Sequence, residues 1–427
     1  MLDIHYIRDQ KALVIQGLQQ RHFQAAAETV EALLAVDAKR RKTQATLDAE
    51  AATLNQCTQQ IGQLMKQGDK AAAAKAKEQT LALKATVKTL TQALKEHEEA
   101  LHAALSALPN LPHAKVPKGS SAADNVVVDE KKAVLLEPSA PLLPHWELAQ
   151  KYALVDFELG SKITGAGFPV YKGPGARLQR ALINFFLDEA LQAGYEEVQP
   201  PVLVNEASAY GSGQLPDKEG QMYQLKDESL YLIPTSEVPL MNLYRNVILP
   251  QEGLPIKNVA YTPCFRREAG SWGSHVRGLN RLHQFDKVEL VQVQLPQQAD
   301  QALEAMCAHV RQLLEKLELP YRVLQLCSGD LGFTAALTYD LEVWAPGQQR
   351  WLEVSSVSTC ATYQSRRMQL RYRDANGKRL FPHTLNGSAL ALPRIVAALL
   401  ENHQTTDHIR IPTALQPYTG FPVIESL

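Results

Sequence analysis

A long proline-free segment at the start of the chain most constrains its fold. No proline occurs before Pro109, and glycine occurs there only at Gly17, Gly62 and Gly68. In the first part of this segment, two rows of residues repeat at heptad spacing. The rows are Leu33, Arg40, Leu47, Leu54 and Ile61, and Gln44, Ala51, Thr58 and Met65. The pattern predicts a long helix with a packed seam along one side.

The second part of the segment repeats this pattern. One row contains Leu83, Leu90 and His97, and the other contains Val87, Leu94, Leu101 and Leu108. Residues 67–69 (Gln-Gly-Asp) predict a break between the two helices. Because so short a turn must reverse the chain, the two helices should be antiparallel. Each would be about 60 Å long at 1.5 Å per residue, so the sequence predicts a long coiled-coil arm.

Lysine and arginine residues are frequent along the two predicted helices, nearly all of them outside the seam rows. They are Lys39, Arg40, Arg41, Lys42, Lys70, Lys75, Lys77, Lys84, Lys88 and Lys95. One interpretation is an ordinary solvated surface, because exposed helices need charge for solubility. The other is contact with an RNA backbone, which requires positive charge and reach rather than base-specific geometry.

The composition changes after Pro109 and Pro112, which end the helical segment. From about Leu148, helical patterns alternate irregularly with short strand patterns, which predicts an α+β domain on a largely antiparallel sheet. The expected domains are residues 1–110, carrying the arm, and residues 111–427, a mixed body. The predicted strands include residues 198–204, 288–294 and 351–354, and residues 176–194 and 298–319 are predicted helices.

Charge and cysteine content exclude several classes of protein. Lysine and arginine number 44 against 45 aspartate and glutamate residues, so any contact with nucleic acid must be local. The first residues resemble no signal peptide, and no apolar run is long enough to cross a bilayer, so we expect a cytoplasmic protein without membrane contact. The five cysteines form no CxxC pair, which predicts reduced packing residues rather than disulfides or zinc ligands.

A candidate nucleotide site lies between residues 261 and 291. The sequence contains no GxxxxGK[ST] phosphate loop and no GxGxxG turn. Instead, Arg266 and Glu268 precede a glycine-containing loop, and Phe285 and Glu289 follow it. An arginine fork suits phosphate or carboxylate, an aromatic ring suits a base, and a carboxylate suits an exocyclic amine. A hairpin presenting these four side chains would bind a nucleotide.

The segment FRREAGSWGSHVRGLNRLHQFDKVEL resembles motif 2 (about 261–291) of class II aminoacyl-tRNA synthetases, specifically of bacterial-type seryl-tRNA synthetases. Residues of about 177–204, ending in GYEEVQPPVLV, resemble motif 1, the dimer interface of that family. Residues of about 383–404, beginning HTLNGSALALPR, resemble motif 3. The amino-terminal arm also matches the family. The resemblance covers the whole chain and implies an antiparallel-sheet class II catalytic domain behind a coiled-coil arm.

The resemblance implies a role for each residue around ATP. Phe285 would stack on the adenine, Glu268 would lie near its amino group, and Arg266 would bridge the α-phosphate and the serine carboxylate. Arg394 would cover the other adenine face and reach the γ-phosphate, so Arg266 and Arg394 are the predicted catalytic residues. The other predicted ATP-binding residues are Arg267, Glu353, Val354, Ser355 and Ser356, of which Glu353 and Ser356 would also bind Mg²⁺.

The predicted serine pocket contains Thr235, Ser236, Glu237, Arg266, Glu289 and Ser388, again by resemblance. A pocket that hydrogen-bonds the substrate hydroxyl disfavours alanine, because alanine leaves buried polar groups unpaired. A threonyl enzyme of this class would need zinc, and the sequence offers no convincing Cys/His set, so we expect no zinc.

The implied activity is seryl-tRNA synthesis by a homodimer. L-Serine and ATP would form seryl-adenylate, and the arm would hold tRNA(Ser), with tRNA(Sec) as a second candidate substrate. Two alternatives stay open: a related ligase that loads a carrier protein, and a silent RNA-binding paralogue. The intact arm argues against the first, and the presence of Arg266 and Arg394 argues against the second. Departures from the family pattern include Arg267, Trp272, Val357, Thr359, Ala389 and Pro393.

Overall fold

The computed structural model describes residues 1–131, 142–217, 219–268 and 276–425. The described chain divides into two compact units. One unit comprises Leu2–Gln19 and Phe23–Pro109, and it is helical. The other comprises Met1, Gln20–His22 and Asn110–Leu427, and it contains the strands.

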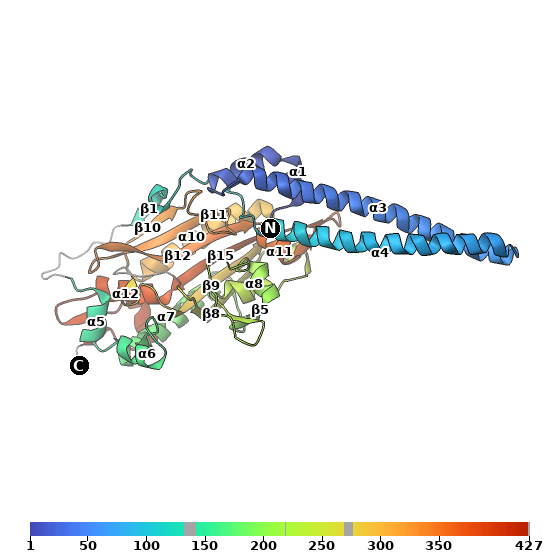
Figure 1. The fold of residues 1–427 in the computed structure, drawn as a ribbon. Helices are drawn as coiled ribbons and strands as arrows, with labels where there is room; N and C mark the ends of the chain where they lie inside the picture. Colours follow the sequence, from blue (N-terminus) through green and yellow to red (C-terminus); the bar gives the residue numbers. More distant parts are fainter. Residues whose placement is uncertain (132–141, 218, 269–275, 426–427) are drawn as a thin grey trace. The chain divides into compact units, whose positions relative to one another are not determined.

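The helical unit is built on two long antiparallel helices that lie side by side (Figure 1). Helix α3 ends at Lys66 and α4 begins at Lys70, so the predicted turn at 67–69 is confirmed. The Asp69 carboxylate caps α4 by accepting a hydrogen bond from the Ala72 amide over 2.9 Å. The helices of this unit are α1 (Ile4–Asp9), α2 (Lys11–Gln20), α3 (Ala26–Lys66) and α4 (Lys70–Ser106).

The seam between α3 and α4 follows the predicted heptads except near the turn. Leu33, Leu94 and Leu101 are buried, but Thr58 and Met65 are exposed. Cys57 and Leu64, one position earlier, are half-buried instead. The prediction for Thr58 and Met65 was therefore wrong. Two successive three-residue steps, from Ala51 to Leu54 and from Leu54 to Cys57, interrupt the alternating spacing, and such an interruption displaces the later seam positions to the preceding residue.

The body contains an eight-stranded sheet in which every neighbouring pair is antiparallel except β4 and β8. The predicted α+β fold with an antiparallel sheet and a helical arm is confirmed. In sheet order, the strands are β1 (Val126–Lys131), β10 (Tyr321–Gln325), β11 (Leu337–Ala345), β12 (Arg350–Ala361), β15 (His383–Ala391), β9 (Gln284–Gln294), β8 (Ile256–Phe265) and β4 (Glu196–Glu197).

Smaller sheets and helices surround this sheet. The strands are β2 (Val155–Asp156), β3 (Val170–Tyr171), β5 (Leu203–Asn205), β6 (Leu230–Leu232), β7 (Ile248–Pro250), β13 (Arg371–Arg373), β14 (Arg379–Leu380), β16 (His408–Arg410) and β17 (Val423–Glu425). The α-helices are α5 (His145–Lys151), α6 (Phe157–Ile163), α7 (Gly173–Gln192), α8 (Glu206–Ser212), α9 (Glu237–Asn242), α10 (Ala299–Lys316), α11 (Tyr363–Arg367), α12 (Leu392–Asn402) and α13 (Gln416–Thr419). The 3₁₀ turns include η1 (Ala122–Asp124), η2 (Gln251–Gly253), η4 (Pro296–Gln298) and η5 (Thr413–Leu415).

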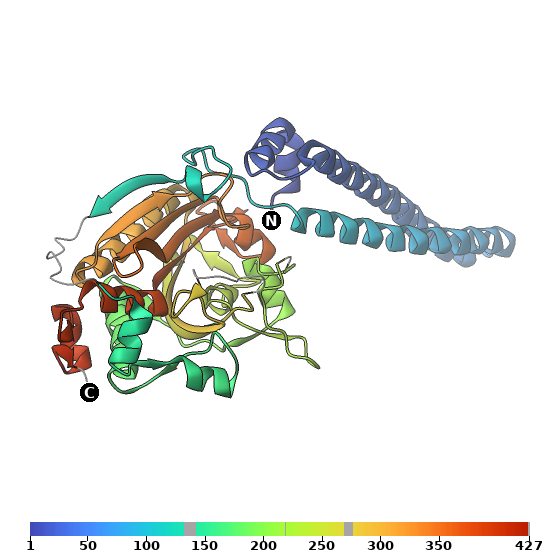
Figure 2. The ribbon, with the colours of Figure 1, turned by 60° about the vertical axis from the view of Figure 1, so that its left-hand side comes forward.

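The main core lies between one face of the twisted sheet and helices α7, α10 and α12 (Figure 2). Val288 and Leu290 of β9 point into this core, and they are fully buried. Because side chains alternate along a strand, Phe285, Lys287 and Glu289 face the opposite side of the sheet. That side is available for a binding site.

The predicted strand over residues 198–204 was wrong in its extent. Strand β4 ends before this range at Glu197, and only the last two residues of the range belong to a strand, because β5 begins at Leu203. Between these strands lie Pro200 and Pro201, which have no amide hydrogen to donate to a neighbouring strand. Within the part of the chain that the structure describes, no helix is long and apolar enough to span a membrane. All five cysteines are free thiols, as the sequence predicts.

Candidate active site

A cavity of about 620 Å³ lies on the open side of the sheet, against β9, β12 and β15. Nearly all of the predicted site residues line it, although they come from segments up to 159 positions apart. The exceptions are Ser236 and Arg267. The predicted residues that line the cavity are Thr235, Glu237, Arg266, Glu268, Phe285, Glu289, Glu353, Val354, Ser355, Ser356, Ser388 and Arg394.

Strands β8 and β9 form a hairpin that places Arg266 beside Phe285. Cys264 pairs with Phe285 across the hairpin, and the Arg266 amide donates to the His283 carbonyl oxygen over 2.9 Å. The Arg266 guanidinium carbon lies 5.2 Å from the centre of the Phe285 ring. Its Nε donates to the Pro234 carbonyl oxygen over 3.4 Å. The arginine is therefore held at the cavity wall by the ring and by the segment that carries Thr235.

Glu268 lies beside Arg266 at the end of the hairpin strand. Its carboxylate pairs with Arg281 over 3.3 Å, and its φ of 46° lies in the left-handed region. Such a conformation is uncommon for a residue with a side chain, so the turn aims the carboxylate at some cost in backbone strain. Residues 269–275, which include Trp272, lie outside the described part of the chain.

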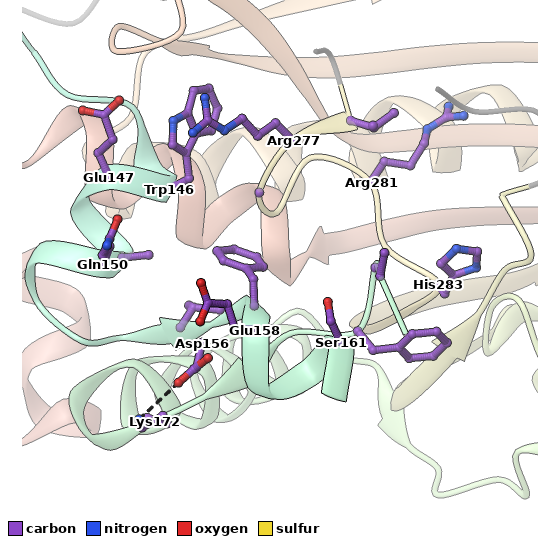
Figure 3. A pocket seen from close by; sticks show the side chains of 18 of the residues that line it. Trp146, Glu147, Gln150, Asp156, Glu158, Ser161, Lys172, Arg277, Arg281 and His283 are labelled. Atoms are coloured by element: carbon purple, nitrogen blue, oxygen red, sulfur yellow. Dashed lines mark hydrogen bonds and ion pairs between the residues drawn. The ribbon is translucent and has the colours of Figure 1, made fainter. Parts of the chain in front are cut away.

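Arg267 instead lines a larger cavity of about 940 Å³ (Figure 3). Trp146 and Arg277 stack at its upper edge, with 4.7 Å between the guanidinium carbon and the ring centre. The His283 ring stacks on the Phe168 ring, with 5.3 Å between the ring centres. Apart from Arg267 and Glu268, this cavity contains none of the predicted site residues. The smaller cavity therefore contains nearly all of the predicted site residues. The larger cavity lies next to it, because Glu268 and Arg281 line both.

Glu289 and Ser388 form the polar end of the smaller cavity. The Ser388 hydroxyl donates to Glu289 Oε2 over 3.1 Å, from the neighbouring strand β15. Lys287 Nζ lies 2.6 Å from the same oxygen, and both side chains of this ion pair are at most 7% exposed. Glu289 is thus a buried carboxylate that is compensated by a cation and still faces the cavity.

Thr235 and Glu237 lie at the start of α9. The Thr235 hydroxyl oxygen accepts a hydrogen bond from the Glu237 amide over 3.3 Å. Gln364 of α11 donates to the Glu237 carboxylate over 2.6 Å. Burial and the nearby charge of Glu289 raise the pKa of Glu237. Ser236 is fully buried behind these residues and does not reach the cavity.

Arg394 lies in the first turn of α12 and lines the same cavity as Thr235. Its Nη1 donates to the Glu353 carbonyl oxygen over 2.6 Å, and its Nε donates to the Asn280 carbonyl oxygen over 3.1 Å. Two backbone acceptors from different segments therefore fix the direction of this guanidinium. The fork geometry suits an anionic group such as a phosphate.

The predicted Mg²⁺ ligands, Glu353 and Ser356, lie together on β12. Asp340 pairs with Ser356 across the strands β11 and β12. One oxygen of its carboxylate, Oδ1, is buried without a protein hydrogen-bond partner. Burial and the charge of Glu353 raise the pKa of Asp340. Two carboxylates and a hydroxyl with an unpaired buried oxygen are hard oxygen donors, so these residues fit a magnesium ion.

Lys287, Gln364 and Asp340 were not predicted from the sequence. For Lys287 a signal was available, because it lies two positions from both Phe285 and Glu289 and must share their face of β9. Gln364 carries no such signal, since its contact with Glu237 joins residues 127 positions apart. Asp340 has no distinguishing signal in the sequence, because its position opposite Ser356 depends on the pairing of β11 with β12.

This antiparallel sheet, with Arg266 beside Phe285 on one hairpin and Arg394 at the start of α12, defines a class II aminoacyl-tRNA synthetase. Residues 222–403 match the family model described as tRNA synthetase class II core domain (G, H, P, S and T). Residues 1–112 match the model described as Seryl-tRNA synthetase N-terminal domain. The model that matches the core covers synthetases for several amino acids, whereas the model that matches the helical unit belongs to the synthetases for serine.

Full-length relatives agree with this assignment. The chain is 47% identical over 426 residues to the Serine–tRNA ligase of Salinibacter ruber, covering 99% of this chain and 98% of the relative. It is 46% identical over 424 residues to that of Akkermansia muciniphila, covering 98% of each. The chain belongs to the seryl-tRNA synthetase family. The predicted family and the predicted enzyme class, an aminoacyl-tRNA ligase for serine, are confirmed.

Solved structures of the family share the whole fold. The seryl-tRNA synthetase of Pyrococcus horikoshii, solved with ATP, matches with a TM-score of 0.93 at 33% identity, over all of both chains. The cytoplasmic Serine-tRNA ligase of Naegleria fowleri, solved with AMP, matches with a TM-score of 0.87 at 25% identity, over 100% of this chain and 99% of the other.

Proposed function

We propose that the 620 Å³ cavity is where this ligase forms seryl-adenylate from L-serine and ATP. The seryl group then passes to the 3′-terminal ribose of tRNA(Ser). The observation that carries this proposal is that one cavity is lined by two different groups of side chains. Arg266 and Phe285 at one end suit a nucleotide, and Glu289 with Ser388 at the other suits a small hydroxyl amino acid.

We assign Arg266 to the point where the serine carboxylate and the α-phosphate would meet. Attack of the carboxylate on phosphorus builds negative charge on the phosphate oxygens. A guanidinium already held in place by Phe285 and the Pro234 carbonyl stabilises that charge without reorganising. Arg394 would contact the nucleotide from the opposite side and favour departure of pyrophosphate. Both arginines are therefore assigned as catalytic.

The pocket for serine consists of Thr235, Glu237, Glu289 and Ser388. Two buried carboxylates around one cation site suit the serine ammonium group. The Glu289–Ser388 pair offers hydrogen-bond partners to the serine hydroxyl, which alanine lacks. The site thereby selects serine by leaving buried polar groups unpaired when another small amino acid enters.

Glu353 and Ser356, with Asp340 behind them, would hold Mg²⁺. The ion would neutralise charge on the ATP phosphates. Glu268 would accept a hydrogen bond from the adenine amino group, and Phe285 would stack on the ring. Arg267, which lines the neighbouring cavity, would contribute to ATP binding only from the edge of the site.

The basic residues of the arm would contact the tRNA backbone. Lys75, Lys77, Lys84 and Lys88 are all exposed along α4. Recognition through shape and phosphates suits RNA, whose deep groove side chains read poorly. We infer a cytoplasmic homodimer, because residues 177–204 resemble the motif that forms the dimer interface in this family.

ATP/pyrophosphate exchange tests the proposed chemistry. We expect exchange that depends on serine, requires no tRNA, and is lost in Arg266→Ala. Arg41→Ala is the matched control, because Arg41 lies on the helical arm and pairs there with Asp37. Robust exchange with a different amino acid would contradict the pocket assignment. No exchange with any amino acid would favour a silent RNA-binding protein, whereas transfer to a carrier protein instead of tRNA would favour the other alternative.

A further inference from the structure

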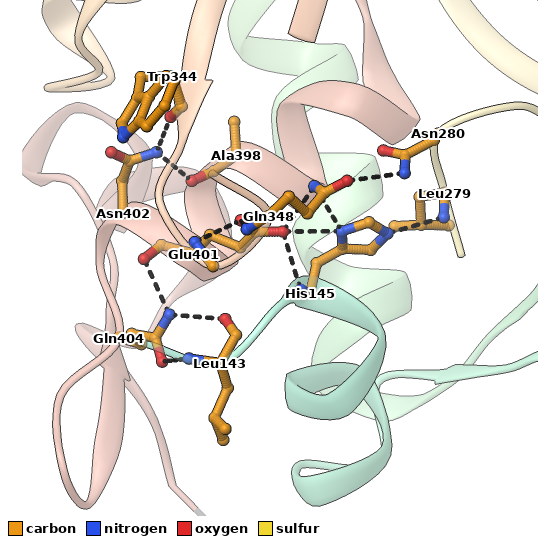
Figure 4. Close-up of polar contacts among 11 residues, drawn as sticks. Leu143, His145, Leu279, Asn280, Trp344, Gln348, Ala398, Glu401, Asn402 and Gln404 are labelled. Atoms are coloured by element: carbon orange, nitrogen blue, oxygen red, sulfur yellow. Dashed lines mark hydrogen bonds and ion pairs between the residues drawn. The ribbon is translucent and has the colours of Figure 1, made fainter. Parts of the chain in front are cut away.

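A buried polar network lies beside the nucleotide end of the cavity (Figure 4). His145, the first residue of α5, and Glu401, near the end of α12, both have fully buried side chains. His145 Nδ1 lies 2.9 Å from Glu401 Oε1, and the His145 amide donates to the same oxygen over 2.9 Å. The other carboxylate oxygen accepts the amides of Gly347 and Gln348 over 3.0 and 3.2 Å. Glu401 is therefore held firmly, and it in turn orients the imidazole.

The other ring nitrogen of His145 holds the chain that lines the cavity. The Leu279 amide donates to His145 Nε2 over 2.9 Å. Because Nε2 accepts this bond, the ring hydrogen must lie on Nδ1, where it donates to Glu401. Gly278 makes this approach possible: a Cβ at that position would lie 2.3 Å from Nε2. The backbone of residues 278–279 is thus seated directly on the imidazole.

A second contact reaches the next residue of the same segment. The Asn280 side-chain amide donates to Gln348 Oε1 over 2.8 Å. The side-chain amide of Gln348 in turn donates to Glu401 Oε1 over 2.8 Å. Glu401 therefore supports Leu279 through His145 and Asn280 through Gln348, and Figure 4 shows both routes meeting at its carboxylate.

The supported segment contacts Arg394, which is proposed to be catalytic. The Asn280 carbonyl oxygen accepts the Nε hydrogen of Arg394 over 3.1 Å. Arg394 and Glu401 lie on the same helix, two turns apart. The network therefore joins the two ends of α12 through the cavity wall. A shift of Leu279–Asn280 would move one of the two backbone acceptors that direct the guanidinium.

We propose that His145 and Glu401 are positioning residues for Arg394. They hold the Leu279–Asn280 backbone where the Asn280 carbonyl oxygen orients the guanidinium toward ATP. Neither side chain lines the cavity, so neither touches the substrate. The inference rests on the proposed function, because it takes Arg394 to contact ATP.

Two substitutions of His145 separate its two hydrogen bonds. His145→Asn keeps a donor near the Nδ1 position but has no atom that reaches the Leu279 amide. His145→Gln places a carbonyl oxygen near the Nε2 position and can still accept that bond. We expect His145→Asn to raise the KM for ATP about 10- to 100-fold, as loss of a supporting contact does elsewhere. The KM for serine should stay within about twofold. His145→Gln should recover most of the ATP affinity.

A double-variant cycle distinguishes positioning from a general structural role. In an Arg394→Ala background, His145→Asn should have little further effect on the ATP dissociation constant measured by calorimetry, because the guanidinium is already gone. Gln348→Ala, which removes the support of Asn280 together with the side-chain contacts of Gln348 to Glu401 and His145, should weaken ATP binding in the same direction by about three- to tenfold. Urea unfolding of each variant confirms that it is folded, and Gln348→Ala tests the proposal if His145→Asn does not fold.

Several outcomes would overturn the inference. They are an unchanged ATP KM in folded His145→Asn, an equal rise in the KM values for ATP and serine, or the same loss with and without Arg394. Failure of the proposed function is distinguishable, because it would appear as an absence of serine-dependent exchange in the unsubstituted protein.

Discussion

The Ser388 hydroxyl donates a hydrogen bond to Glu289 Oε2 over 3.1 Å, across the neighbouring strands β15 and β9. This contact fixes both groups in advance of substrate binding. The same carboxylate oxygen is paired with Lys287, so the acceptor is already desolvated and oriented. In the serine pocket that we propose, selectivity would follow from this arrangement, because a substrate that offers no hydroxyl would leave the buried groups without a partner.

Ser388→Ala should therefore weaken serine recognition without affecting ATP. We expect the KM for serine in pyrophosphate exchange to rise about tenfold, the usual cost of a lost hydrogen bond in a desolvated site. The KM for ATP should stay the same. Ser355→Ala is a useful comparison, since the Ser355 hydroxyl donates to the Ser388 backbone and not to Glu289. A rise in the KM for ATP as large as that for serine would argue against the assigned pocket.

Lys287→Met should destabilise the protein strongly. The substitution leaves the Glu289 carboxylate buried without its cation, and breaking a buried ion pair by removing one partner costs about 3–5 kcal/mol. Urea denaturation measures the loss. In Lys287→Met/Glu289→Gln the uncompensated charge is absent, so much of the stability should return. If the double variant were as unstable as the single one, packing rather than charge would explain the effect.

Glu237 should make stability decrease as the pH rises. Burial and Glu289 raise its pKa in the folded protein above the value of the unfolded chain. The folded state therefore binds more protons, and the free energy of unfolding falls as the pH increases from the unfolded pKa through the raised one. Glu237→Gln removes this titration, so its stability relative to the unsubstituted protein should increase as the pH rises above the usual pKa of a glutamate. A pH-independent difference would mean that Glu237 titrates normally.

The arm should be required for tRNA charging but not for adenylate formation. Replacing about Lys39 to Lys95 with a short turn should leave serine-dependent pyrophosphate exchange intact and abolish aminoacylation. Equal loss of both activities would refute this division.

A gentler variant tests the charge itself. Substituting Lys75, Lys77, Lys84 and Lys88 with glutamine should weaken tRNA binding. The dependence of log affinity on log salt concentration should also flatten by about one unit for each phosphate contact removed. Replacing exposed Glu78 and Glu96 on the same helix with glutamine is the matched control, and it should not weaken binding.

The sequence by itself determined the arm and the class of fold, and it named many of the residues that line the 620 Å³ cavity. Heptad spacing is a local property of a helix, so the spacing alone assigns Leu33, Leu94 and Leu101 to the seam where they are buried. Alternation along β9 likewise places Phe285 and Glu289 on one face. The roles of Thr235, Ser388 and Arg394 came from resemblance, because no local pattern connects positions so far apart.

Only the tertiary structure decided how these residues are supported. The seam residues near the turn are Cys57 and Leu64, because two successive three-residue steps after Ala51 interrupt the heptad spacing. His145 and Glu401 are 256 positions apart and meet only when α5 packs against α12. Hydrogen bonds between distant segments depend on how elements pack in three dimensions, and a one-dimensional pattern carries no record of that packing. Most residues that line the 620 Å³ cavity and were proposed to contact substrate were therefore accessible from the sequence, whereas His145, Glu401 and Gln364, which hold such residues in place, were not.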